Sequence, residues 1–243
     1  MKHYILNFTL NSNCRGSNDY VKNYKLKIPN DKLFYEEPRF IGSIYNEKIN
    51  FHPYLLDIEL YPKSKINDLI LDGGPISTKL IVSGKLKLIL ENYRKTGMQF
   101  FNINVLKKDN IYNDYWILNI YEKSFEAINF EKSEIYKTFN TFNLLEKLEI
   151  NSLKEFLQIK NEIELLGYPN GIFIKKIEIC NEIELDFYIL TNIEGGVKYI
   201  VSENLKKEIE DASCTGIEFQ PIELSLNEWL MPGGEREKKY GKY

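Results

Sequence analysis

The sequence predicts an α+β fold with mixed sheets and a few short helices, and three observations lead to this class. A pattern of strand, helix and strand occurs twice, around 81–105 and 200–224. Short segments with apolar residues at every second position run through the first part of the chain. Of the 243 residues, 43% are hydrophobic and 14% aromatic. A chain of this size has a substantial core, which buries roughly 70% of the unfolded surface.

Residues 1–65 are expected to form a region of strands and loops. Tyr4, Leu6 and Phe8 share one face of a period-two segment, and 24–28 alternates in the same way. The Asn-, Ser- and Gly-rich stretch 11–19 predicts a loop, and 54–60 predicts another short strand. No part of this region has helical periodicity.

The strand–helix–strand pattern is an internal repeat. Residues 81–105 and 200–224 align without a gap at a spacing of 119, and ten of the 25 positions are identical. The identical pairs are Ile81/Ile200, Val82/Val201, Ser83/Ser202, Leu86/Leu205, Lys87/Lys206, Glu91/Glu210, Thr96/Thr215, Gly97/Gly216, Phe100/Phe219 and Ile103/Ile222. Two copies at this distance do not make a solenoid.

Local chemistry explains why both copies keep the same residues. Ser83 and Ser202 follow an apolar strand end, where a hydroxyl can accept a hydrogen bond from a free helix N–H. A helix of about ten residues follows. Gly97 and Gly216 stand where that helix must end and the chain must turn, a place that favours positive φ. We therefore interpret these residues as cap and turn, because no nucleophile elbow or phosphate loop surrounds them.

Three further elements are expected between and beside the copies. The aromatic-rich stretch 114–121 predicts a strand whose rings belong to the core. Ser152 and Glu155 form a capping-box pattern, which opens a helix that ends before Gly167 and Pro169. Its apolar residues at helical spacing are Leu153, Phe156, Leu157, Ile163 and Leu166. Residues 172–190 predict two strands with a break near 180–181, followed by a turn at 195–196.

The second of those strands carries the predicted partner-binding residues. Alternation places Ile183, Leu185, Phe187 and Ile189 on one face. The opposite, outer face then carries Glu182, Glu184, Asp186 and Tyr188. We expect this acidic face to complement a basic protein partner, such as a nuclease.

The expected organisation is a single domain over 1–230, with 231–243 as a flexible tail that has no apolar pattern. Two half-domains that meet near residue 135 are the alternative.

Composition argues against several classes of function. The net charge of −3 provides no global field for nucleic acid or an anionic membrane, so neither is expected as a partner. The chain has two histidines, no metal-ligand spacing and three cysteines far apart, so we expect no metal, no cofactor, no catalytic residues and no enzyme activity. The number of cysteines is odd, which argues against a disulfide framework and favours a reducing compartment. The sequence also lacks a signal-peptide pattern and an apolar run of about 18 residues, so we expect a cytoplasmic protein.

The chain contains Ile-Val-Ser strings at 81 and 200, Tyr-Trp-Ile-Leu-Asn-Ile at 115–120, Glu-Lys-Ser at 131–133 and Thr-Gly-Ile-Glu-Phe at 215–219. Together these strings resemble the immunity protein 11 family of bacterial immunity proteins. The similarity covers about 65–224, with Asn129 where the family pattern has an acidic residue. The resemblance implies a cytoplasmic protein that binds one cognate antibacterial toxin and neutralises it, and it transfers no catalytic residues.

The sequence therefore predicts an immunity protein of a polymorphic toxin system that acts by protein–protein interaction. The first alternative is an enzyme of small-molecule or nucleic-acid metabolism with a cleft between the duplicated units. A homodimerising structural protein is the other alternative. The seventeen tyrosines are more than a core of this size needs, which favours a binding protein.

Overall fold

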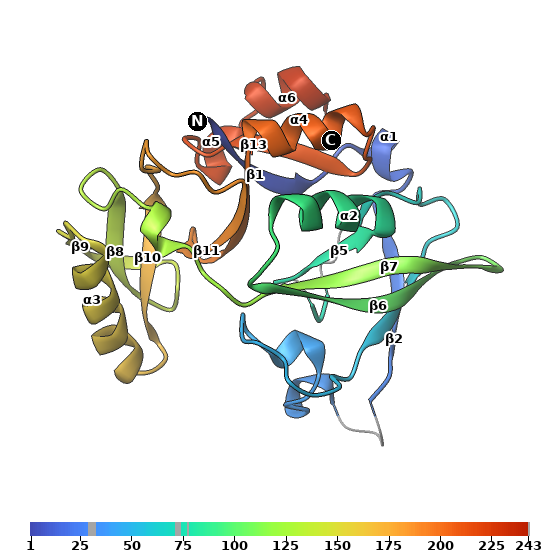
Figure 1. Cartoon of the computed structure of the whole chain (residues 1–243), viewed down its shortest axis with the longest axis horizontal. Coiled ribbons are helices and arrows are strands. Elements are labelled where there is room, and N and C mark those ends of the chain that lie inside the picture. Colours follow the sequence, from blue (N-terminus) through green and yellow to red (C-terminus); the bar gives the residue numbers. More distant parts are fainter. Residues whose placement is uncertain (29–32, 71–73, 77, 243) are drawn as a thin grey trace. The chain divides into compact units, whose positions relative to one another are not determined.

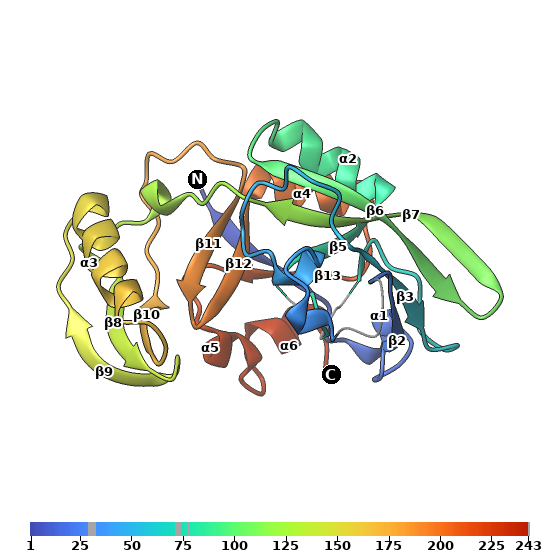
Figure 2. The same ribbon diagram turned by 90° about the horizontal axis from the view of Figure 1, so that it is seen from below.

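The computed structural model describes residues 1–28, 33–70, 74–76 and 78–242. It confirms the α+β class, with two mixed sheets and short helices (Figures 1 and 2). The chain forms two compact units, each assembled from separated segments. Unit 1 comprises 1–6, 123–203 and 219–239, and unit 2 comprises 7–122, 204–218 and 240–243. That the two units act as one domain stays a prediction.

The sheet of unit 2 has six strands, of which β3 and β6 pair in parallel and the other neighbours are antiparallel. In spatial order they are β2 (Val21–Leu26), β3 (Leu56–Leu60), β6 (Met98–Lys107), β7 (Asn110–Ile120), β5 (Leu80–Ser83) and β4 (Leu69–Ile70). The helical elements of this part of the chain are α1 (Ser12–Arg15), η1 (Phe34–Glu36), η2 (Ile41–Ser43) and α2 (Gly84–Tyr93). The strands expected at 24–28, 54–60 and 114–121 are thus present with shifted ends, and 11–19 contains one helical turn.

The first copy of the repeat has the predicted structure. β5 ends at Ser83, whose hydroxyl accepts a hydrogen bond from the Leu86 N–H at 3.2 Å and so caps α2. The buried face of α2 comes from Leu86, Ile89 and Leu90. Gly97 has φ +75°, which confirms the expected left-handed turn before β6.

A lysine lies buried between the six-stranded sheet and the segment at 44–49. Lys79 is 5% exposed, and its ammonium donates to the Ile44 carbonyl at 2.9 Å and to the Asn119 amide oxygen at 2.7 Å. Asn119 in turn donates to the Glu47 carbonyl at 2.9 Å. Burial lowers the pKa of Lys79 from 10.5 to about 8, because the charged form loses its hydration. These bonds hold the segment against the sheet.

Because of Lys79, we expect the free energy of unfolding to rise as the pH is raised from about 8 to about 10.5. The unfolded chain binds a proton at this side chain up to its pKa of 10.5, whereas the folded chain releases it near 8, so stability rises with pH between these values. The rise from pH 7 to about pH 9.5 is about 2 kcal/mol in the free energy of unfolding. Urea unfolding across this range measures it. Lys79→Met should remove the rise, and Lys198→Met, which replaces a lysine paired with Glu194, should retain it. Equal pH profiles for wild type and Lys79→Met would contradict the assignment.

The second sheet has seven strands and lies mostly in unit 1. In spatial order they are β13 (Ile217–Pro221), β1 (His3–Phe8), β12 (Gly196–Ser202), β11 (Phe187–Ile193), β10 (Asn170–Lys176), β8 (Glu134–Phe139) and β9 (Asn143–Leu148). β10 and β11 pair in parallel. The remaining helical elements are η3 (Phe125–Ala127), α3 (Leu153–Leu165), α4 (Glu203–Asp211), α5 (Leu226–Leu230) and α6 (Glu235–Tyr240).

The second copy of the repeat also forms strand, helix and strand, as β12, α4 and β13. Leu205 and Ile209 are buried apolar residues of α4 and correspond to Leu86 and Leu90. Gly216 has φ +83°. The sequence-predicted duplication is therefore a structural one.

Helix α3 begins and ends where the sequence indicates, but not all of its predicted apolar face is buried. Ser152 accepts from the Glu155 N–H at 3.2 Å and caps the helix. Phe156 and Ile163 enter the core of unit 1, where α3 lies beside β8 and β10 (Figures 1 and 2). Leu157 and Leu166 are exposed, contrary to the pattern. α3 covers one short sheet face, and a narrower apolar stripe than the sequence pattern predicts is sufficient to cover it.

The second half of 172–190 differs from the prediction. β11 begins at Phe187, and residues 182–186 precede it as an irregular segment. Where a flexible tail is expected, residues 235–240 form α6, and Arg236 of this helix is buried. Mobility of the tail stays a prediction.

Candidate partner-binding surface

The structure separates the four predicted partner-binding residues. Glu182 and Glu184 are exposed in the segment before β11, and Asp186 is half-buried. Tyr188 is 0% exposed, and its hydroxyl has no hydrogen-bond partner among the described residues. The predicted strand face is wrong because the strand begins at residue 187, where both faces are covered. Glu182 and Glu184 are the members of this set that are fully exposed, and a role of these residues in binding stays a prediction.

The segment that carries these glutamates is held at one end by His3. The imidazole Nε2 of His3 donates to the Leu185 carbonyl at 3.3 Å, and the ring meets that of Tyr188 edge-on at 5.8 Å. Burial lowers the pKa of His3 below 6.5, although the bond to Leu185 opposes this. His3 is therefore a packed, neutral residue at pH 7, as its lack of a surrounding motif indicates.

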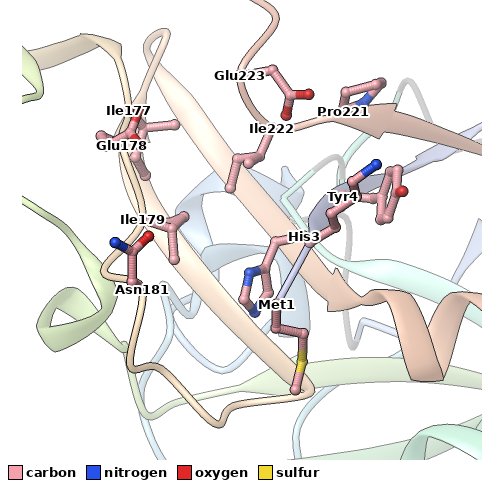
Figure 3. A pocket seen from close by; sticks show the side chains of 11 residues that line it. Met1, His3, Tyr4, Ile177, Glu178, Ile179, Asn181, Pro221, Ile222 and Glu223 are labelled. Carbon is pink, nitrogen blue, oxygen red and sulfur yellow. The ribbon is translucent and has the colours of Figure 1, made fainter.

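A concave pocket of about 370 Å³ lies beside this segment in unit 1 (Figure 3). Glu178 and Glu223 bring carboxylates to its rim, and Ile177, Ile179 and Ile222 provide apolar surface. The remaining lining residues are Met1, Lys2, His3, Tyr4, Asn181 and Pro221. Glu182 and Glu184 follow the lining residue Asn181 in sequence. We name the four exposed glutamates Glu178, Glu182, Glu184 and Glu223 the acidic rim.

Unit 1 also exposes large apolar side chains at one end of its sheet. Tyr168 is 84% exposed, Leu165 79% and Phe142 73%. Phe139 and Leu166 are exposed beside them. We name these five residues the apolar end. Monomeric proteins rarely leave such a group of large apolar side chains in water, so this surface is suited to a protein partner.

Backbone pairing brings the apolar end together from two parts of the chain. Phe139 at the end of β8 is opposite Asn170 at the start of β10, and the Asn140 N–H donates to the Pro169 carbonyl at 2.9 Å. The turn between β8 and β9 is thereby fixed beside the segment that follows α3. Phe142 meets the ring of Phe173 edge-on at 6.3 Å, which orients its exposed side.

The neighbouring strand β9 extends this surface. It is the last strand of the seven-stranded sheet, and Leu144 and Leu145 on it are exposed. An exposed edge strand with apolar side chains is a template for pairing with another chain. The sequence signal for this surface is two apolar clusters, at 139–145 and 165–168, that exceed what the predicted helix and strands can bury.

Unit 2 has a second pocket, of about 470 Å³, against the first copy of the repeat. The Lys87 ammonium lies 4.9 Å from the Trp116 ring centroid and 5.1 Å from that of Phe100, and it pairs with Glu91 at 2.8 Å. The rest of the lining is Arg94, Lys95, Met98 and Gln99. The charges on Lys87 and Glu91 satisfy each other, so this pocket favours the repeat's own packing over a ligand.

In the described part of the chain, no group of three or more His, Cys, Asp and Glu side chains has a geometry for holding a metal ion. Burial raises the pKa of the Cys214 thiol to about 11, the opposite of an activated nucleophile. Across the same residues, no helix combines the length and hydropathy that a membrane span requires.

Comparisons with known proteins found two similarities. The chain is 30% identical over 158 residues to a proline–tRNA ligase from Methanococcus aeolicus. That match covers 63% of this chain but 31% of the ligase, so the chain spans about a third of that relative. Residues 2–224, nearly the whole chain, match the model of the Immunity protein family (Imm11). This match confirms the resemblance seen in the sequence, and the chain belongs to the immunity protein family Imm11.

Proposed function

We propose that this protein binds a cognate antibacterial toxin in the cytoplasm and neutralises it through the apolar end of unit 1. The observation that carries the proposal is the exposure of Phe142, Leu165 and Tyr168 where the β8–β9 turn pairs with the segment after α3. The chain that carries them belongs to an immunity protein family. The proposed action needs no catalytic group, cofactor, nucleic acid or membrane, since occupying the toxin's surface is sufficient.

The apolar end has the chemistry of an interface centre. Aromatic and large apolar side chains that become fully desolvated supply most of the binding energy in stable complexes. A standard interface buries roughly 800 Å² on each partner. The apolar end and the exposed leucines of β9 provide large apolar side chains for an interface of this kind.

The acidic rim supplies the second part of the proposal. Glu178, Glu182, Glu184 and Glu223 are all exposed. Carboxylates outside the contact area can raise the association rate with a basic partner, because their field steers the encounter. We therefore propose a toxin domain with a basic surface, such as a nuclease.

The decisive experiment uses the toxin that the proposal expects to be encoded beside this gene. The C-terminal domain of a large neighbouring reading frame is expressed with and without this protein, and binding is measured by calorimetry. Wild type should restore growth, whereas Leu165→Glu with Tyr168→Asp should weaken binding by about 100-fold, because two central apolar anchors are lost.

The matched control carries the same kind of change on exposed apolar residues of unit 2. Leu88→Glu with Ile111→Glu should leave the dissociation constant within about threefold of wild type, since surface substitutions outside an interface have small effects. Wild-type binding by the Leu165→Glu, Tyr168→Asp variant would refute the apolar end as the interface. Failure of wild type to rescue cells from the adjacent toxin would refute the immunity function.

Charge reversal tests the acidic rim separately. Glu182→Lys with Glu184→Lys should lower the association rate constant by about tenfold at low salt, with little change in the dissociation rate. Stopped-flow binding at two ionic strengths measures this, and high salt should remove the difference. An unchanged association rate would exclude these glutamates from steering.

A further inference from the structure

Two strands that lie 112 residues apart have closely similar sequences. β1 reads His3-Tyr4-Ile5-Leu6-Asn7-Phe8, and the last six residues of β7 read Tyr115-Trp116-Ile117-Leu118-Asn119-Ile120. The central Ile-Leu-Asn is identical, and its Ile and Leu are buried in both strands. This similarity lies outside the two 25-residue segments that the sequence comparison aligned.

The two strands also have the same pairing partners within the repeat. Tyr4 is opposite Val201 in β12, and Trp116 is opposite Val82 in β5. Val82 and Val201 are equivalent residues of the two copies, and the pairs on either side correspond in the same way: His3↔Ser202 with Tyr115↔Ser83, and Ile5↔Ile200 with Ile117↔Ile81.

The opposite edges of the strands agree as well. The Thr9 N–H donates to the Gly216 carbonyl at 2.8 Å, and the Tyr121 N–H donates to the Gly97 carbonyl at 2.9 Å. Gly97 and Gly216 are equivalent, and Thr9 and Tyr121 each follow the similar hexapeptide directly. β1 therefore lies between β12 and β13 as β7 lies between β5 and β6.

The strand before each copy completes the correspondence. The Ser83 N–H donates to the Asp68 carbonyl at 2.8 Å, and the Ser202 N–H donates to the Asp186 carbonyl at 2.9 Å. Each serine hydroxyl donates to the carboxylate of the same aspartate. β4 and β11 follow these aspartates, so each repeated unit has four strands and a helix.

In chain order, the repeat runs from β1 to β6 and again from β7 to β13. The first strand of each repeat completes the sheet of the other repeat. A two-residue turn joins β7 to β6, which keeps β7 close to its place in the sheet. No such turn joins β1 to β12 or β13, because about 190 residues separate them in sequence.

We propose that β1 is an exchangeable strand, and that the slot between β12 and β13 binds residues 3–8 from a second copy of this chain. The slot selects this occupant because it must pair both backbone edges and bury the Ile5 and Leu6 side chains. A strand held by a short turn has a local concentration in the millimolar range, which a second chain cannot match. β1 lacks that advantage, so exchange occurs at β1 and not at β7.

Cysteine cross-linking of full-length chains tests this directly. One chain carries Tyr4→Cys and another carries Val201→Cys; the two are unfolded together, refolded as a mixture and oxidised. The readout is the disulfide-linked peptide that joins positions 4 and 201 of different chains, identified by mass spectrometry. The control mixture carries Trp116→Cys and Val82→Cys, an equivalent pair in the other sheet. Exchange predicts on the order of tenfold more intermolecular cross-link for the first mixture.

Two further variants make every outcome informative. A single chain with both Tyr4→Cys and Val201→Cys must form the bond internally at low concentration, and its failure would overturn the pairing itself. The graft Tyr4→Trp with Phe8→Ile, which brings β1 closer to the β7 sequence and keeps the packed His3, should leave the urea midpoint unchanged. Exchanging the residues at positions 6 and 7, as Leu6→Asn with Asn7→Leu, should lower that midpoint, because an asparagine would then occupy the buried position 6. Equal cross-linking in the two mixtures, or a graft as damaging as the Leu6/Asn7 exchange, would overturn the proposal.

Discussion

Replacing Gly216 with Ala is expected to lower the free energy of unfolding by about 4 kcal/mol. Gly216 has φ +83°, and a Cβ atom there would lie 2.4 Å from the Leu69 carbonyl oxygen and 2.6 Å from the Asn67 Cβ. Left-handed backbone conformation alone costs about 1–2 kcal/mol for a residue with a side chain. The clash adds to this because the Leu69 carbonyl belongs to the backbone of a buried strand and cannot rotate away.

The equivalent glycine of the first copy provides the control. Gly97 has φ +75°, but the atoms nearest to an added Cβ are the carboxylate of Glu122 and the guanidinium of Arg94. These are ends of flexible side chains, so Gly97→Ala should cost about 1–2 kcal/mol, the conformational part alone. Urea unfolding of both variants measures the difference. Equal losses would show that the close backbone approach at Gly216 is not a constraint.

Asp68→Ala should destabilise the protein by about 3 kcal/mol, because one half-buried carboxylate joins three segments of unit 2. Asp68 accepts from the Ser83 hydroxyl at 2.7 Å and from the Thr215 N–H at 2.8 Å, and it pairs with Lys85 at 3.1 Å. Removing the carboxylate leaves these donors without their acceptor. Asp186→Ala removes the corresponding carboxylate of the second copy and is expected to cost about 1 kcal/mol, the value of a single hydrogen bond to Ser202.

The effect of Asp68 should depend on pH in a defined direction. Burial opposes its ionisation, but the bonds from Ser83, Thr215 and Lys85 outweigh burial and hold the pKa of this carboxyl below 3.8. A lowered folded-state pKa contributes stability above the unfolded value, and this stability is lost as the pH falls through the folded pKa. The difference between wild type and Asp68→Asn should therefore be constant above pH 5 or so and shrink below about pH 4. A difference that grows in acid would contradict this.

Much of the repeat could be predicted from the sequence because its signals are local. Ser83 caps α2 by accepting a hydrogen bond from the N–H three residues ahead, and Gly97 forms the turn after this helix. Neighbouring residues therefore suffice to place the helix. Ser152 opens α3 in the same way. Each cap and turn recurs in the second copy at a fixed spacing, which indicates that it is a structural requirement of the repeated unit.

The candidate site was harder to predict because burial depends on distant partners. Alternation from 182 to 189 matches a half-buried strand, yet β11 begins at Phe187 and its first four residues are buried on both faces. Tyr188 is therefore a core residue, although the alternation assigns it to the same outer face as Glu184. Leu166 shows the reverse case: it has helical spacing but lies beyond the sheet that α3 covers, and so it is exposed.

Sequence patterns are sufficient to predict the α+β class, the duplicated strand–helix–strand unit and the resemblance to immunity proteins. These follow from caps, glycines and short periodic segments, whose physics acts within about ten residues. Contacts between distant segments set which apolar side chains remain in water and which strand fills the slot between β12 and β13. Both depend on backbone pairing across as many as 200 residues, where a segment's environment is set by its neighbours in space.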